Sequence, residues 1–208
     1  MTSAEVAVLR FAGRRVPRAL SDLPVHDVVS GGDPKAIDET IDEATTARRV
    51  IVLGAHADLS ALLTRLLRID RLGVEVGFVP GSWGARKALA GAARRVPLIR
   101  DETGTVITRA ALWLPADESA QAITGEAVVD DTVLFDGEVA GVRVEPTATM
   151  PGLRASLTTG RRPRRWVTGR AAQLGTTGAL VVRDGRPSAR PVKRSTFYRH
   201  TTGWLRVG

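Results

Sequence analysis

One short segment of the chain has the character of a strand that is buried on both faces of a sheet. Residues 49–53 read Arg-Val-Ile-Val-Leu, and Gly54 follows them at once. A continuous apolar run of this length is typical of a parallel sheet covered by helices on both faces. Leucines then recur at helical spacing from Leu59 to Leu67. The segment therefore predicts a strand, a glycine-containing loop and an amphipathic helix, with Asp58 as the helix N-cap.

A second strand, loop and helix of this kind follow along the chain. Residues 74–79 predict a strand, and residues 80–84 (Pro-Gly-Ser-Trp-Gly) predict a tight loop. A helix is expected over residues 85–95. Ligand loops in parallel sheets lie at the carboxyl ends of the strands, where both glycine-containing loops fall.

Two further strands and a helix are expected upstream of these units. The strands cover residues 5–11 and 26–29, and Asp33-Pro34 marks the start of the helix, with an N-cap followed by proline. Strand, loop and helix thus alternate at the spacing of βαβ units. We expect residues 1–127 to form a three-layer α/β domain with a mostly parallel sheet.

The pattern changes from about residue 128. Short β-rich runs are separated by turn pairs such as Asp136-Gly137 and Asp184-Gly185, and patterns typical of helices are scarce. Such a sequence is typical of an antiparallel sheet or small sandwich. We therefore predict a small antiparallel β-rich domain over residues 128–208.

The net charge of +8 is distributed unevenly between these parts. Residues 1–130 carry 16 basic and 17 acidic side chains, whereas residues 131–208 carry 14 basic and 5 acidic ones. All but three of the basic residues are arginine. This composition fits a GC-rich genome, and it also fits an anionic partner such as phospholipid or nucleic acid. The sequence leaves both explanations open.

Several classes of protein are disfavoured by what the sequence lacks. It has no cysteine, so disulfides and thiolate metal sites are excluded, and its three histidines lack ligand spacing. We therefore predict no metal site built by the protein alone. No apolar run approaches the roughly 20 residues of a membrane span, and the first 18 residues lack the apolar core of a secretory signal. A cytoplasmic protein is expected.

The first loop, Gly54-Ala55-His56-Ala57-Asp58, is rich in small residues. Small side chains let a phosphate approach the backbone N–H groups at a helix N-terminus. The loop is not a Walker loop, because no Gly-Lys-Ser/Thr follows, and it is not a G-x-G-x-x-G fingerprint. Taken alone, the loop favours an ordinary turn between strand and helix over a phosphate site.

Taken together, these segments resemble the catalytic domain of the diacylglycerol kinase family, which includes sphingosine kinases and other lipid kinases. The family carries a strand followed by Gly-Gly-Asp-Gly-Thr-Leu, and then a strand ending in Pro with a Gly-Thr-x-Asn-Asp-type loop. The counterparts here are VIVL-GAHADL (Val50–Leu59) and GFVP-GSWGARKAL (Gly77–Leu89). VVRDGRP (Val181–Pro187) is similar to the family's strand that ends in Leu-Asp-Gly-Glu-Pro.

The resemblance implies an NAD kinase/diacylglycerol kinase-type fold, ATP and Mg²⁺ as cofactors, and phosphoryl transfer from ATP to a lipid hydroxyl. It also implies a set of nucleotide-binding positions in the two loops. These positions are Gly54, Ala55, His56, Ala57, Asp58, Gly81, Ser82 and Gly84.

The chain departs from the family at its acidic positions. His56 replaces the aspartate of the nucleotide and magnesium network, and imidazole is a poor ligand for Mg²⁺. Arg186 replaces a glutamate, and arginine cannot act as a general base. Asp184 is then the candidate catalytic residue, with an Asp-Gly hairpin turn as its alternative role. Two hypotheses follow: an ATP-dependent lipid kinase, or a catalytically impaired member that serves as a nucleotide- or anionic-lipid-binding scaffold.

A basic stretch stands apart from these motifs. Arg161, Arg162, Arg164 and Arg165 precede Trp166, and such a set is suited to an anionic headgroup layer. Attachment to the inner surface of the membrane would follow, with a solvated loop as the alternative. Nucleic acid is disfavoured as the partner, because the whole chain has nine aromatic residues, too few for a surface on which bases stack.

Overall fold

A computed structural model describes residues 5–29, 33–81, 83–116, 120–159, 162–163 and 165–208, apart from the side chains of residues 159, 162 and 163. The chain divides into two compact units. Unit 1 comprises residues 1–96 and 203–208, and unit 2 comprises residues 97–202.

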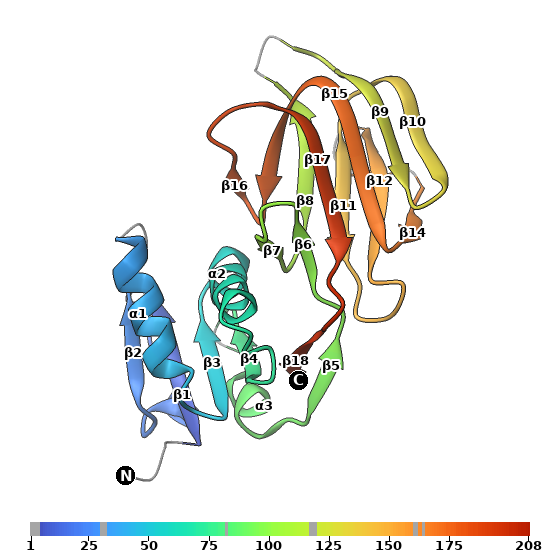
Figure 1. Ribbon diagram of the computed structural model, residues 1–208. Helices are drawn as coiled ribbons and strands as arrows, with labels where there is room; N and C mark the ends of the chain where they lie inside the picture. Colours follow the sequence, from blue (N-terminus) through green and yellow to red (C-terminus); the bar gives the residue numbers. More distant parts are fainter. Residues whose placement is uncertain (1–4, 30–32, 82, 117–119, 160–161, 164) are drawn as a thin grey trace. The chain divides into compact units, whose positions relative to one another are not determined.

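Unit 1 is built on a six-stranded sheet with the order β2-β1-β3-β4-β18-β5 (Figure 1). Its strands are β1 (Val6–Phe11), β2 (Val25–Val28), β3 (Arg49–Leu53), β4 (Glu75–Val79), β5 (Ala93–Val96) and β18 (Trp204–Val207). All neighbouring pairs are parallel except β18 with β5. Every residue of β3 is buried, as expected for a strand covered on both faces.

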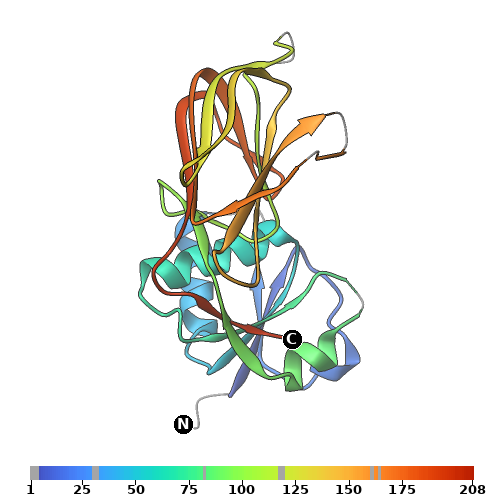
Figure 2. The same ribbon diagram turned by 90° about the vertical axis from the view of Figure 1, so that its right-hand side faces the viewer.

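Helices cover both faces of this sheet, which gives unit 1 three layers (Figure 2). α1 (Pro34–Ala44) packs beside α2 (His56–Arg68) on one face, whereas the 3-10 helix η1 (Arg18–Leu20) packs beside α3 (Ala85–Ala90) on the other. Alternate residues of the strands face each layer, so Val8 and Ile51 join the η1 and α3 side. The predicted α/β fold is confirmed.

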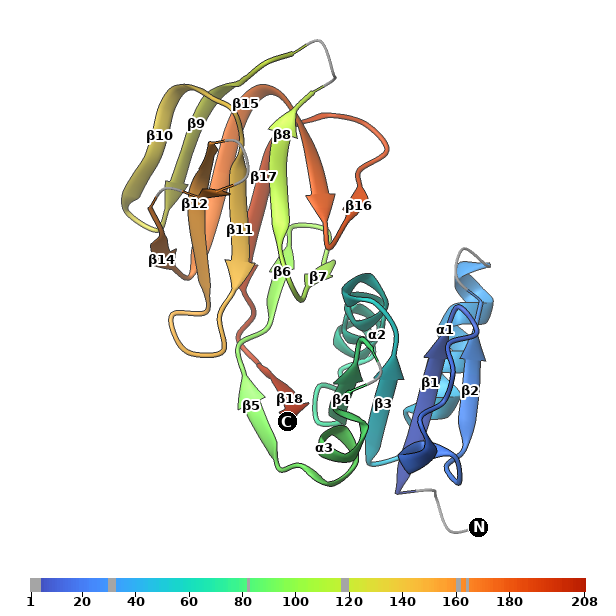
Figure 3. The ribbon, with the colours of Figure 1, turned by 180° about the vertical axis from the view of Figure 1, so that it is seen from behind.

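Unit 2 is an antiparallel β structure whose long strand β15 joins its parts (Figure 3). Its strands are β6 (Ile99–Asp101), β7 (Val106–Ile107), β8 (Ala111–Pro115), β9 (Ile123–Val129), β10 (Thr132–Val139), β11 (Val142–Pro146), β12 (Leu153–Thr159), β13 (Arg162–Pro163), β14 (Val167–Gly169), β15 (Ala171–Arg183), β16 (Arg186–Pro187) and β17 (Val192–Arg199). The first half of β15 pairs with β9 and the second half with β8. On its other side β15 pairs with β17, and that register shifts between Gly175 and Ala179. One strand therefore serves two parts of the sheet.

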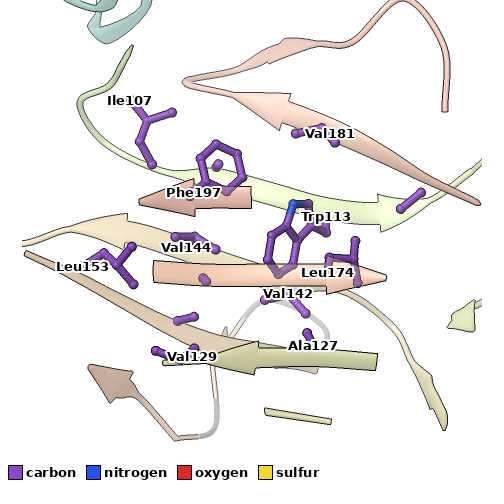
Figure 4. Packing of buried hydrophobic residues seen from close by; sticks show 14 of the residues in the cluster. Ile107, Trp113, Ala127, Val129, Val142, Val144, Leu153, Leu174, Val181 and Phe197 are labelled. Carbon is purple, nitrogen blue, oxygen red and sulfur yellow. The ribbon is translucent and has the colours of Figure 1, made fainter. Parts of the chain in front are cut away.

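The core of unit 2 is centred on two aromatic residues (Figure 4). Trp113 and Phe197 are fully buried, with ring centroids 5.9 Å apart. The indole Nε1 of Trp113 donates to the Oγ of Ser195 at 3.0 Å, which satisfies its buried N–H group. Aliphatic side chains from β8, β9, β11, β12 and β15 surround this pair.

Two boundaries differ from the prediction. The expected division at residues 127/128 falls inside β9, because β6, β7, β8 and β9 already pair within unit 2. The helix expected over residues 85–95 ends at Ala90, because residues 93–96 pair with β18 instead. β18 itself was expected in the β-rich domain, but it lies in the sheet of unit 1. Among the described residues, no helix is both long and apolar enough to span a bilayer.

Candidate functional site

The strand order of unit 1 defines a place where a ligand can enter. β1 is followed in sequence by β2 on one side, whereas β3 and β4 lie on its other side. Loops that leave neighbouring strands in opposite directions open a crevice at the carboxyl ends of those strands. In unit 1 this switch lies between β1 and β3.

A pocket of about 420 Å³ is found at this edge of the sheet. Leu53 and Val79, the last residues of β3 and β4, contribute its apolar part. The remaining lining residues come from the loops after β1 and β4. They are Arg14, Arg15, Pro17, Arg18 and Gly81. The volume lies within the usual range for a small-molecule site, about 300–1,000 Å³.

A tight turn after β1 directs the arginines to this edge. Ala12 and Gly13 both have left-handed backbone angles, with φ of 53° and 61°. The conformation costs an alanine roughly 1–2 kcal/mol, so the strain at Ala12 is balanced by the rest of the fold. Arg14 then donates from its guanidinium to the carbonyl oxygen of Pro80. The loop after β1 is thereby tied to the loop after β4.

Arg15 and Arg18 are held differently from Arg14. Both are exposed and line the pocket. Within the described part of the chain, their guanidinium groups form no hydrogen bond or ion pair. Two cations beside a pocket that carries no carboxylate among its described lining residues make a site suited to an anion.

The first glycine loop is closed by a side chain of its own helix. α2 begins at His56 with Ala55 as its N-cap, so Asp58 lies at the third helical position and not at the predicted N-cap. Its carboxylate accepts a hydrogen bond from the backbone N–H of Ala55 at 2.7 Å. A Cβ atom at Gly54 would lie 2.8 Å from Oδ2 of Asp58, so the glycine is required by this carboxylate. An acidic group in the first turn is also favourable to the helix dipole, so this helix start is satisfied from within the chain.

The other residues of this loop are placed around the helix start. Ala55 is exposed, and His56 and Ala57 are half-buried. The His56 ring packs against Phe78 of β4, with ring centroids 4.9 Å apart. Among the described residues that line the pocket, none comes from the segment 54–58.

The second glycine loop contributes directly to the pocket. Gly81 lines it, and Gly84, with φ of 95°, is the N-cap of α3. Trp83 between them is 90% exposed. Ser82, also predicted to bind nucleotide, lies outside the described residues.

The carboxylate of Asp184 is engaged in holding a hairpin. Asp184 and Gly185 form the turn between β15 and β16, with φ of 48° and 88°. The carboxylate accepts hydrogen bonds from the backbone N–H groups of Thr108, Arg109 and Ala110 at 2.7–2.9 Å. It also accepts one from the Thr108 hydroxyl at 3.0 Å. These four bonds use about all the lone-pair sites that a carboxylate offers.

The predicted arginine patch is described only in part. Arg161 and Arg164 lie outside the described residues, as does the side chain of Arg162, and Arg165 is exposed. The aromatic residue of the patch already has a cation partner, because the guanidinium of Arg154 lies 4.2 Å from the ring centroid of Trp166.

A carboxylate holds Arg154 in this position. Glu145 accepts hydrogen bonds from Arg143 and Arg154. Burial raises the pKa of Glu145, but these hydrogen bonds and the two positive charges outweigh it, so the pKa lies below its ordinary value.

The chain was compared with known proteins by sequence and by structure. No family model matches the sequence, and no curated protein matches it. Solved structures do match. A putative diacylglycerol kinase from Bacillus anthracis str. Sterne has a TM-score of 0.74 at 11% identity, covering 100% of this chain and 98% of that chain. An NAD kinase from Archaeoglobus fulgidus, in complex with ATP, has a TM-score of 0.62 at 13% identity, covering 98% and 93%.

The chain has the diacylglycerol kinase/NAD kinase-type fold. Yeast NADH kinase complexed with NADH is also similar, with a TM-score of 0.57 at 9% identity, covering 100% of this chain and 84% of that chain. At such identities the likeness concerns the fold alone. The resemblance seen in the loop sequences is confirmed at that level.

The carboxylates of this kinase-type fold do not form a magnesium site in the described part of this chain. No group of three or more His, Cys, Asp or Glu residues is placed there to hold a metal ion. The carboxylate of Asp58, in the first loop, already accepts a hydrogen bond from the Ala55 N–H. Because Mg²⁺ needs several oxygen ligands, the residues present do not fit a protein-held ion.

The structure brings only part of the predicted site together. Gly81 lies at the pocket, and the loop 54–58 lies at the end of the neighbouring strand, whereas Asp184 belongs to unit 2. Sequence reasoning missed Arg14, Arg15 and Arg18. Their signal was present, because Gly13-Arg14-Arg15 directly follows a predicted strand at the same edge of the sheet.

Proposed function

We propose that the protein binds ATP or a related nucleotide in unit 1, with the phosphates held by Arg14, Arg15 and Arg18, and that it acts as a nucleotide-binding scaffold. One observation carries the proposal: Arg15 and Arg18 have no partner among the described residues and line a pocket at the switch between β1 and β3. Arginine is suited to phosphate because its planar guanidinium donates two parallel hydrogen bonds. The nucleotide-bound kinases of the same fold support the choice of ligand.

The scaffold role rests on the carboxylates. Phosphoryl transfer depends on positioned phosphates, a metal ion that neutralises charge and a group that orients the acceptor. In this chain Asp58 caps its own helix and Asp184 is saturated with hydrogen bonds. Mg²⁺ would therefore enter only as a ligand of the nucleotide phosphates.

Phosphorylation of a lipid is the second candidate function. It is favoured by the similarity to structures described as diacylglycerol kinases and by the Asp184-Gly185 turn of the family motif. Transfer of labelled phosphate from ATP–Mg²⁺ to diacylglycerol in mixed vesicles tests it. Turnover that is lost in Asp184→Ala, with ATP affinity retained, would establish the kinase and overturn the scaffold.

Nucleotide binding itself is tested by calorimetric titration of ATP against substituted proteins. We expect Arg15→Gln and Arg18→Gln each to weaken ATP binding about tenfold, because a hydrogen bond to a charged group contributes about 1.5–3 kcal/mol. Arg68→Gln is the matched control. It also removes one exposed arginine, but from the last turn of α2, at the opposite edge of the sheet.

The control variant separates a local site from the overall charge. If Arg68→Gln weakens ATP binding as much as Arg15→Gln does, the pocket is not the site. Absence of ATP binding to the unsubstituted protein at millimolar concentration, with no rise in its unfolding temperature, would refute the proposal altogether.

A further inference from the structure

The loop after β4 exposes a tryptophan at the edge of the sheet that carries the arginine pocket. Trp83 is 90% exposed, an unusual state for the largest apolar side chain. The other three tryptophans are covered: Trp113 is fully buried, Trp204 is 9% exposed, and Trp166 lies against Arg154. An indole in this state has both ring faces available to a planar partner.

Trp83 and the arginines lie on segments that are joined to each other. Pro80, at the start of the tryptophan loop, accepts the hydrogen bond from Arg14. Gly81 then lines the pocket, and Trp83 follows two residues later. Two residues of extended chain span at most about 7 Å, so the backbone of Trp83 lies within that distance of a pocket-lining residue.

The pocket and the tryptophan offer two different chemistries to one ligand. The arginines suit a phosphate group, and the indole suits a flat ring that carries a π system. A ligand with only an apolar ring would make no use of the arginines. A ligand with only phosphate groups would make no use of the indole. A nucleotide has both parts in one molecule, with the base separated from the phosphates by the ribose.

We propose that Trp83 stacks on the base of the bound nucleotide and thereby selects nucleotides over free polyphosphates. The inference rests on the proposed nucleotide binding and assigns its base-recognising residue. Stacking tolerates any base, because every base has a π face. The preference is therefore for a purine or pyrimidine ring in general, with the larger purine ring gaining more contact.

Intrinsic fluorescence tests this directly. Titration with ATP is expected to quench and blue-shift the emission of the exposed indole, whereas inorganic triphosphate binds without that change. Trp83→Ala is expected to weaken ATP binding about tenfold and to leave triphosphate binding within twofold. Trp166→Phe is the matched control and is expected to retain the quenching. Far-ultraviolet circular dichroism checks that each variant is folded. Because the Trp83 side chain is exposed, its replacement is expected to leave the fold intact.

Each contrary outcome points to a different error. Equal ATP affinity in Trp83→Ala and the unsubstituted protein, with unchanged Trp83 emission on binding, would overturn the stacking and leave nucleotide binding intact. Failure of both ATP and triphosphate to bind would overturn the proposed function and the inference with it. A blue shift with anionic phosphatidylserine vesicles but not with ATP would overturn it in favour of an interfacial anchor.

Discussion

At the scale of single residues, the surroundings of a carboxylate decide what it can do. Asp184 was the one acidic side chain of the family motif left in the sequence, and its alternative role was a hairpin turn. The left-handed backbone at Asp184 and Gly185 and the four accepted hydrogen bonds fit that alternative. The oxygens of this carboxylate are therefore engaged by the backbone of residues 108–110.

Replacing Asp184 by Asn tests this structural role. An amide accepts hydrogen bonds through one oxygen only, and its N–H₂ group faces backbone N–H donors in the place of the second oxygen. We expect Asp184→Asn to lower the free energy of unfolding by about 1–3 kcal/mol and to leave ATP affinity unchanged. Chemical denaturation and calorimetry measure the two quantities. An unchanged stability would show that the bonds to residues 108–110 contribute little.

The arginines of the pocket show why single-residue prediction has limits. The sequence showed where the loops after two strands lie, because strand and helix periodicities are local. It did not show that the turn at Ala12 and Gly13 brings Arg14 to Pro80, since that contact joins residues 66 positions apart. The glycine loop 54–58 could be recognised from the sequence, because its pattern is local and resembles a family motif.

At the scale of elements, the start of α2 shows how a glycine can be required without a ligand. The Asp58 carboxylate packs against Gly54 and caps the N–H of Ala55. An acidic group here also interacts favourably with the positive end of the helix dipole. Gly54 therefore serves the junction of β3 and α2, whatever ligand the neighbouring pocket binds.

Gly54→Ala tests this junction. The new methyl group would meet Asp58 at 2.8 Å, so the helix start must shift. We expect a loss of about 1–3 kcal/mol in unfolding free energy, measured by denaturant titration. Gly73→Ala is the matched control, because a Cβ atom there has nothing within 4 Å, and it is expected to cost almost nothing. Equal effects of the two changes would contradict the close contact.

Elements with strong periodicity were predicted well, and those defined by pairing were not. The strands β1, β3 and β4 and the helix α1 lie where the sequence pattern expected them, and α2 differs only in beginning at His56, before the predicted N-cap Asp58. Residues 93–95 were predicted as the end of a helix because their local composition permits one. Their strand conformation comes from pairing with β18, more than 100 residues away in the sequence, and no local pattern records such a partner.

At the scale of the whole molecule, unit 1 is completed by the last strand of the chain. β18 lies between β4 and β5, parallel to the first and antiparallel to the second. Trp204 and Val207 of β18 are buried in unit 1. Unit 2 is therefore inserted between β5 and β18, which is why a single boundary at residues 127/128 does not describe the chain.

Removal of residues 203–208 is expected to affect the two units unequally. The deletion leaves β4 and β5 without their shared neighbour and opens the sheet of unit 1. We expect unit 1 to unfold at lower temperature and ATP binding to be lost. The emission of Trp113, buried in unit 2, should keep its unfolding midpoint. Far-ultraviolet circular dichroism and fluorescence follow the two unfolding transitions. An equal fall in both unfolding midpoints would contradict the expectation that the deletion destabilises unit 1 alone.

The position of β18 also sets an order of events during synthesis. A ribosome releases residues 1–96 long before residues 203–208, so the growing chain carries an open strand edge on β4 while all of unit 2 is made. Unpaired edges of this kind invite pairing with other chains. Because removal of β18 is expected to abolish ATP binding, a nucleotide could stabilise this sheet only after β18 has paired with β4 and β5. The pocket would therefore become able to bind its ligand only after residues 203–208 have been made and have joined the sheet.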